Sequence, residues 1–514
     1  MDYGAVWFQR VDLKTIMIKS KVLSDETSGG INWFFVYSLV LCAAFGKSLI
    51  TGQAYASPLE VVIWYPLMAL SGFLAALHLI SFIKRDWPVK YEMKVYLAMI
   101  LSIIFGLFCS LLPFWGSEAA GMPLTLFQIG GYFLTLGIYP FSAGPDAFLR
   151  GLAWGAAVII AWLLYKEKQS IFDILLIAVS VWLGMSFILI LPSLILIITF
   201  TAKGLFVAWS NADLVGEFAR INLFSYWADG QLLRWFTGFG NQTVNALLLY
   251  TGSIIYIWGV FFGLMRNRSV YWKILQGSGF YAFIPLLFMV LYGYQAGLGR
   301  QGWIDIDWAA WLVLVCVLLI SWLKLLMMVT GFDVKETFLS VFGFLGAMLL
   351  GWPVLLAYVG VLLAGYLFGE ISKAVQISMR SEVVMMMVLP IFALLTALFA
   401  RKGLSLEPEA LKILGAAIVF AWLYGLIMTG ASLRWSRLKV IAVWFAGSLL
   451  LWVLAGVFAP AAIMLLAGVV LWLFWQKAVL DKRILPTIVW GTALAVLLLV
   501  IWLPRLARPE LIPM

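Results

Sequence analysis

The sequence predicts an all-α, polytopic integral membrane protein, and three observations support this class. Of the 514 residues, 64% are hydrophobic and only 11% are charged, whereas about 25% are charged in ordinary soluble domains. The mean hydropathy of the whole chain is +1.04. The apolar residues form continuous runs, such as residues 312–320. Because strands of a membrane barrel alternate apolar and polar residues, continuous runs indicate helices.

The chain divides into four predicted regions. Residues 1–30 are too polar and too mixed in charge for a signal peptide, so we expect a cytoplasmic segment on the membrane surface. Residues 31–200 are predicted to form a first transmembrane bundle, and residues 243–514 a second one. Between them, residues 201–242 are predicted to connect the bundles along the membrane interface.

Each membrane crossing needs about 20 apolar residues in a helix, which predicts about 13–15 spans in all. The predicted spans lie near residues 31–51, 61–83, 95–114, 149–166, 170–200, 243–265, 275–295, 308–330, 337–369, 382–400, 411–430, 440–458, 460–476 and 485–504.

Three segments need individual interpretation. Residues 337–369 are too long for one straight span, and Gly351-Trp352-Pro353 predicts a turn between two helices there. Residues 170–200 contain Pro192 but no polar turn, which predicts one long, kinked helix. Residues 124–144 contain glycines and a proline, and we expect this segment to be re-entrant or interfacial without fully crossing.

Lysine and arginine residues near the spans predict a cytoplasmic N-terminus. With this orientation most basic clusters face the cytoplasm, whereas Arg401, Lys402, Arg505 and Arg508 fall on the opposite side. We expect the protein to be integral to a membrane, specifically the cytoplasmic (inner) membrane of a bacterium. The net charge of +10 is then explained by contact with anionic lipid headgroups, and no nucleic-acid partner is expected.

The connector has the pattern of a helix that lies in the membrane interface. Its apolar residues recur at helical spacing, with charged residues such as Asp213 and Arg220 between them. The apolar positions that define the interfacial helix are Leu214, Phe218, Ile221, Phe224 and Trp235. A link between the two bundles is one interpretation, and a lateral gate or docking surface is the other.

Ionisable residues within the spans are the candidate functional residues, because each costs roughly 2.5–3.5 kcal/mol to insert at the middle of a span. The candidates are Lys324, Asp173, Lys47, His78, Asp333 and Glu336. Lys324 lies deepest, and we expect it to face the protein interior and to pair with Asp333, Glu336 or Asp173.

The remaining candidates also have structural interpretations. Lys47 can extend to the interface, and Asp173 can lie at the interface itself. His78 is either a hydrogen-bonded packing residue or part of a proton relay. Gly365 and Gly369 form a small-xxx-small pattern, which favours close helix packing within the chain or dimerisation.

The sequence lacks the patterns of several functional classes. With a single histidine, neither a haem with two histidine ligands nor a metal site with several histidines can be built. The three cysteines show no paired spacing. We therefore expect no cofactor, no metal site and no catalytic residue. Tryptophans lie in the middle of spans, for example Trp154 and Trp182, which fits either ordinary packing or a lipid-facing surface.

The predicted function is that of a transporter or permease-like protein, which moves a small or lipophilic solute. The many spans, the helices interrupted by proline or glycine and the few charges within spans favour it. The first alternative is a non-catalytic integral subunit of a larger membrane complex, and the second is a lipid-handling enzyme or flippase. The expected partners are membrane lipids and, for the first alternative, other membrane subunits.

Overall fold

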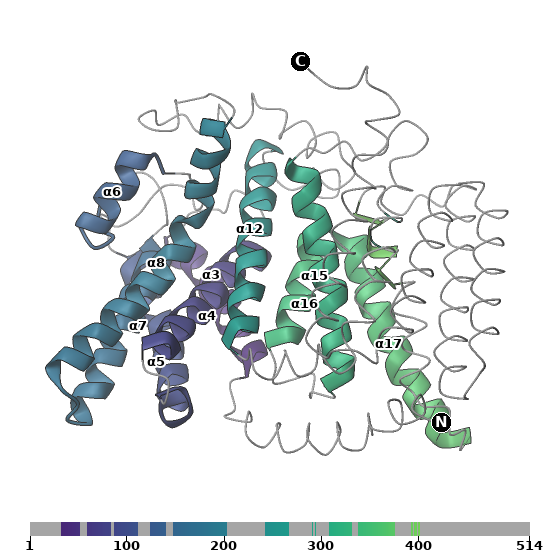
Figure 1. The fold of residues 1–514 in the computed structure, drawn as a ribbon, viewed down its shortest axis with the longest axis horizontal. Helices are drawn as coiled ribbons and strands as arrows, with labels where there is room; N and C mark the ends of the chain where they lie inside the picture. Colours follow the sequence, from purple (N-terminus) through teal and green to yellow (C-terminus); the bar gives the residue numbers. More distant parts are fainter. Residues whose placement is uncertain are drawn as a thin grey trace, which may run out of the picture.

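The computed structural model of the chain describes a purely helical fold over eleven elements (Figure 1). The described residues are 32–51, 59–83, 87–111, 124–139, 147–202, 242–266, 290, 293, 308–330, 338–375, 392–393, 395–397 and 399–400. The elements are α3 (Trp33–Thr51), the π-helix η1 (Glu60–Trp64), α4 (Tyr65–Ile83), α5 (Trp87–Ser110), α6 (Leu126–Leu134), α7 (Ala147–Lys166), α8 (Ile171–Ala202), α12 (Gln242–Arg266), α15 (Trp308–Thr330), α16 (Phe338–Leu349) and α17 (Trp352–Val375).

Four helices are long and apolar enough to cross a membrane, by length and composition, in the part of the chain that the structure describes. They are Glu60–Ile83, Ala147–Lys166, Ile171–Ile198 and Asn245–Met265. The all-helical class predicted from the sequence is confirmed for the described residues. Most of the other predicted spans up to residue 369 coincide with shorter apolar helices, and those beyond residue 400 lie outside the described residues.

Helices α4, α5, α7 and α8 pack closely because small residues lie at their crossings. A Cβ atom on Gly151 of α7 would lie 2.6 Å from Cβ of Cys109 and 3.0 Å from Cα of Gly106, both on α5. A Cβ atom on Gly184 of α8 would lie 2.8 Å from Cα of Ala76 on α4. The backbones of these helices are therefore in direct contact. Helix α4 also packs against α12, which lies between α8 and α15 (Figure 1).

Helices α16 and α17 confirm the predicted interruption of residues 337–369. Helix α16 ends at Leu349, and Gly351 has φ = +107°, a left-handed conformation that glycine adopts readily. The phenol of Tyr358 in α17 contacts Gly343 in α16. Because fifteen positions along one straight helix would span about 22 Å, this contact requires α17 to fold back on α16.

The other two segment predictions agree with the structure in part, because the kink in residues 170–200 and the re-entrant or interfacial course of residues 124–144 stay predictions. Helix α8 continues for 32 residues with Pro192 inside it. Helix α6 has nine residues, about 14 Å of helix, and is too short to cross a hydrocarbon core about 30 Å thick. The predicted interfacial residues from Leu214 to Trp235 lie outside the described residues, so this prediction stays a prediction.

Candidate functional site

Arg150 is a charged residue buried inside the helical bundle. It lies in the first turn of α7, and only 1% of its surface is exposed. Its Nη1 atom donates hydrogen bonds to the carbonyl oxygens of Ile138 at 2.9 Å and Gly137 at 3.4 Å. Its guanidinium carbon lies 5.9 Å from the ring centroid of Tyr132. Carbonyl dipoles and an aromatic face therefore compensate the buried positive charge.

The local sequence of α6 explains why these carbonyls are available. Thr125 and Gln128 form a capping box at the start of the helix, in which each side chain bonds the backbone N–H of the other residue. At the other end Leu136 and Gly137 adopt positive φ angles of 54° and 86° and reverse the chain. The carbonyl end of a helix carries partial negative charge, which favours a nearby cation such as Arg150.

Further aromatic side chains lie around Tyr132 and the turn after α6. Tyr132 stacks on Trp182 of α8 with the ring centroids 6.2 Å apart, and its hydroxyl lies 3.4 Å from Oγ of Ser186. Nε1 of Trp154 donates a hydrogen bond to the carbonyl of Leu136 at 2.9 Å. We name Tyr132, Arg150, Trp154, Trp182 and Ser186 the α6 cluster.

The α6 cluster is rich in hydrogen-bond donors. Burial raises the pKa of the Tyr132 phenol, so its hydroxyl keeps its proton. The indole N–H of Trp182 is buried and has no hydrogen-bond partner within the described chain. Together with the Arg150 guanidinium, these groups favour a ligand that carries acceptor oxygens.

Lys47 lies near the same end of the bundle. Its Nζ atom donates a hydrogen bond of 2.9 Å to the hydroxyl of Tyr65, a fully buried residue at the start of α4. The ring of Tyr65 in turn meets Phe148, two residues before Arg150, with centroids 5.8 Å apart. Lys47 therefore points to a buried tyrosine, and Tyr65 and Phe148 connect it to the start of α7.

Glu60 is a buried acid close to this end of the bundle. It is 4% exposed and begins the π-helix η1 that leads into α4. Single π-helical turns are rare and are frequently found at functional sites. Trp64, in the same turn, donates a 3.1 Å hydrogen bond from Nε1 to the hydroxyl of Thr251, which fixes η1 against α12.

The other predicted site residues lie elsewhere. The half-buried ring of His78 packs against Phe262, with centroids 5.6 Å apart. Asp173 lies in the first turn of α8, and its backbone N–H donates to the hydroxyl of Ser170 at 3.1 Å. A carboxylate is favourable at this helix end, so the position of Asp173 has a structural explanation.

The surroundings of the remaining predicted residues lie outside the described part of the chain. Lys324 belongs to α15, but its side chain is not among those described, and Asp333 and Glu336 lie outside the described residues. Gly365 and Gly369 belong to α17, and their surroundings are not described. These assignments stay predictions.

Sequence reasoning missed Arg150 and Glu60. Both lie near the ends of their spans, where a charge is ordinarily explained by the interface. One signal was present for the arginine, because Gly151 and Gly155 follow it at small-xxx-small spacing. Such a helix packs closely at its very start, which places its first turn inside the protein.

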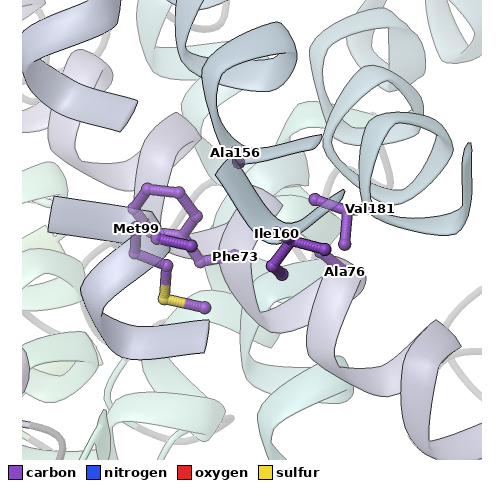
Figure 2. Close-up of a pocket in the computed structure, with 7 residues that line it drawn as sticks. Phe73, Ala76, Met99, Ala156, Ile160 and Val181 are labelled. Atoms are coloured by element: carbon purple, nitrogen blue, oxygen red, sulfur yellow. The ribbon is translucent and has the colours of Figure 1, made fainter. Parts of the chain in front are cut away.

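A small pocket between α4, α5, α7 and α8 is not a candidate site (Figure 2). Only apolar side chains line it, and its volume of about 10 Å³ is at the lower limit of the space that one water molecule needs. Its lining residues are Phe73, Ala76, Ala98, Met99, Ala156, Ile160 and Val181.

The described residues contain no group of three or more His, Cys, Asp or Glu that could hold a metal ion. No family model, no curated protein and no solved structure matches this chain.

Proposed function

We propose that the chain is a transporter or permease-like protein, which moves a small or lipophilic solute across a membrane. The observation that carries the proposal is the burial of Arg150 in a helix long and apolar enough to span. Charged residues within membrane segments are energetically costly, and they mark substrate and ion pathways in transport proteins. We assign the α6 cluster as the part of the molecule that contacts the solute.

The interrupted helices support this proposal. The turn that follows α6 places the carbonyls of Gly137 and Ile138 on Arg150, and the α16–α17 pair is broken at Gly351. In transporters, the ends of discontinuous helices contribute backbone groups to substrate and ion sites. A solute with acceptor oxygens would bind here to the hydrogen-bond donors of the α6 cluster.

The proposal includes the predicted topology of about 13–15 spans in a bacterial inner membrane. It also retains the prediction that Lys324 faces the protein interior. Ile320 and Ser321, one turn earlier in α15, are fully buried, and residues three and four apart share a helix face.

A cytoplasmic N-terminus gives a labelling prediction. In a Cys42→Ser background we expect Ala5→Cys to react with a membrane-impermeant maleimide only after cells are permeabilised. Gln53→Cys, in the predicted first outward loop, is the matched control and should react in intact cells. Labelling of Ala5→Cys in intact cells would contradict the orientation.

Ligand binding tests the proposed function on the purified full-length protein. We expect one chemical class from a panel of carboxylates, phosphates, sugars and polyols to raise its melting temperature saturably, because a ligand stabilises the state that it binds. The effect should be absent in Arg150→Lys, which keeps the charge but loses the planar fork of donors.

Two outcomes would favour the alternatives instead. Comigration with fixed partner proteins in mild detergent, without any stabilising solute, would identify a subunit of a larger membrane complex. Chemical conversion or flipping of a labelled lipid in vesicles would identify the lipid-handling alternative.

A further inference from the structure

The hydroxyls of Tyr256 in α12 and Ser321 in α15 are unusual among the buried polar groups. Both residues are fully buried, and neither hydroxyl has a hydrogen-bond partner among the described residues. By contrast, the buried hydroxyls of Thr251 and Ser253 in α12 donate to their own helix, to the carbonyls of Leu247 and Leu249, both at 2.8 Å. The hydroxyl of Tyr256 cannot donate to a carbonyl of its own helix, because it lies at the end of a long side chain, too far from that backbone.

The phenol of Tyr256 is directed into the junction of three helices. A Cβ atom on Gly346 of α16 would lie 2.7 Å from the Tyr256 hydroxyl and 2.9 Å from Cγ1 of Ile320 in α15. Helices α12 and α15 also meet one turn earlier, where Sγ of Cys316 donates to the carbonyl of Ser253 at 3.9 Å. The hydroxyl therefore lies where α12, α15 and α16 converge, close to the residue that precedes Ser321.

Two glycines of α16 leave room for tyrosine side chains from the neighbouring helices. The ring of Tyr256 stacks on Phe342 with centroids 6.3 Å apart. One turn before Gly346, Gly343 contacts the phenol of Tyr358 from α17. Two tyrosines from different helices thus approach successive glycines of α16, and any larger residue at either position would displace a phenol.

We propose that Tyr256 and Ser321 form a binding site for a small, uncharged hydrogen-bonding group, either a water molecule or a hydroxyl of a small polar solute. A buried polar group without a partner loses its hydration and gains nothing in return. In a lipid environment no alternative partner is available. Phenylalanine would fill the same space without this cost, so the phenol is explained by a ligand that bonds to it. This inference is independent of the α6 cluster.

Thermal unfolding of the purified full-length protein tests the site through Tyr256→Phe. If a ligand bonds to the phenol, the variant should melt about 1–3 °C lower than the wild-type protein. Tyr37→Phe is the matched control, because its hydroxyl donates to the Val62 carbonyl at 3.3 Å and its loss calibrates one broken hydrogen bond. An unchanged or higher melting temperature for Tyr256→Phe would overturn the proposal.

A double-mutant comparison tests whether the two hydroxyls share one ligand. Ser321→Ala and Tyr256→Phe should then be non-additive, with the double variant melting close to the lower of the two single variants. Full additivity would overturn the shared site. Exhaustive dialysis separates the two ligand sources: a difference between wild type and Tyr256→Phe that persists identifies water, and one that disappears identifies a dialysable solute.

Discussion

Arg150→Met is expected to destabilise the packing of α7 against the turn after α6 by about 2–4 kcal/mol. The guanidinium makes a 2.9 Å hydrogen bond to the carbonyl of Ile138 and a longer one of 3.4 Å to that of Gly137. A bond to a charged group contributes about 1.5–3 kcal/mol, and the longer bond adds less than the shorter one. Methionine fills similar space but leaves the carbonyls of Gly137 and Ile138 unsatisfied and removes the cation from the face of Tyr132. Limited proteolysis in the turn after α6, together with thermal unfolding, measures the effect.

Lys166→Met is the matched control for this change. Lys166 lies in the last turn of the same helix, is exposed, and has its Nζ atom 4.0 Å from the ring centroid of Trp162. Exposed cation–π contacts contribute about 0.5–1 kcal/mol, so this variant should stay close to wild type. Equal stability of the Arg150→Met and Lys166→Met variants would show that the buried charge does not hold α6 in place.

Gly184→Leu is expected to prevent correct folding. A Cβ atom at this position would lie 2.8 Å from the backbone N and Cα atoms of Ala76. Because backbone atoms cannot move away as a flexible side chain can, α8 and α4 would have to separate along their contact. Overpacking typically costs about 1–3 kcal/mol and sometimes more, and a forced separation of two helices belongs at the upper end.

Gly360→Leu is the control, since a Cβ atom at Gly360 of α17 meets nothing within 4 Å. Leucine also has a better helix propensity than glycine by up to about 1 kcal/mol. The yield of monodisperse protein in size-exclusion chromatography reports the result. We expect Gly360→Leu to match wild type and Gly184→Leu to be lost to aggregation, and equal yields would refute the close α4–α8 contact.

The sequence predicted the helical elements well where hydrophobic length and helix-breaking residues decide the outcome. The break near Gly351, the uninterrupted helix through Pro192 and the short segment after Thr125 follow from these local signals. Each of them depends on residues that are adjacent in the chain, so no knowledge of tertiary contacts was needed.

The α6 cluster was not predictable by the same reasoning. Trp154 and Trp182 were noted as tryptophans within spans, but the contacts of Trp182 with Tyr132 and with Trp154 join three helices. Arg150 looks like an ordinary interfacial charge until the carbonyls of the turn after α6 are placed beside it. Periodicity identifies which residues share a helix face, but not which helix lies opposite.

Solute flux through the purified full-length protein in proteoliposomes tests the central claim most directly. The solute class that stabilises the protein should cross vesicles that contain the wild-type chain. Lys166→Met should retain this flux. Arg150→Lys, reconstituted to the same density, should show a flux at least about tenfold lower than that of the wild type, equivalent to 1.4 kcal/mol. Wild-type flux in Arg150→Lys, or no flux of any stabilising solute through folded wild-type protein, would contradict the proposed role of the α6 cluster in transport.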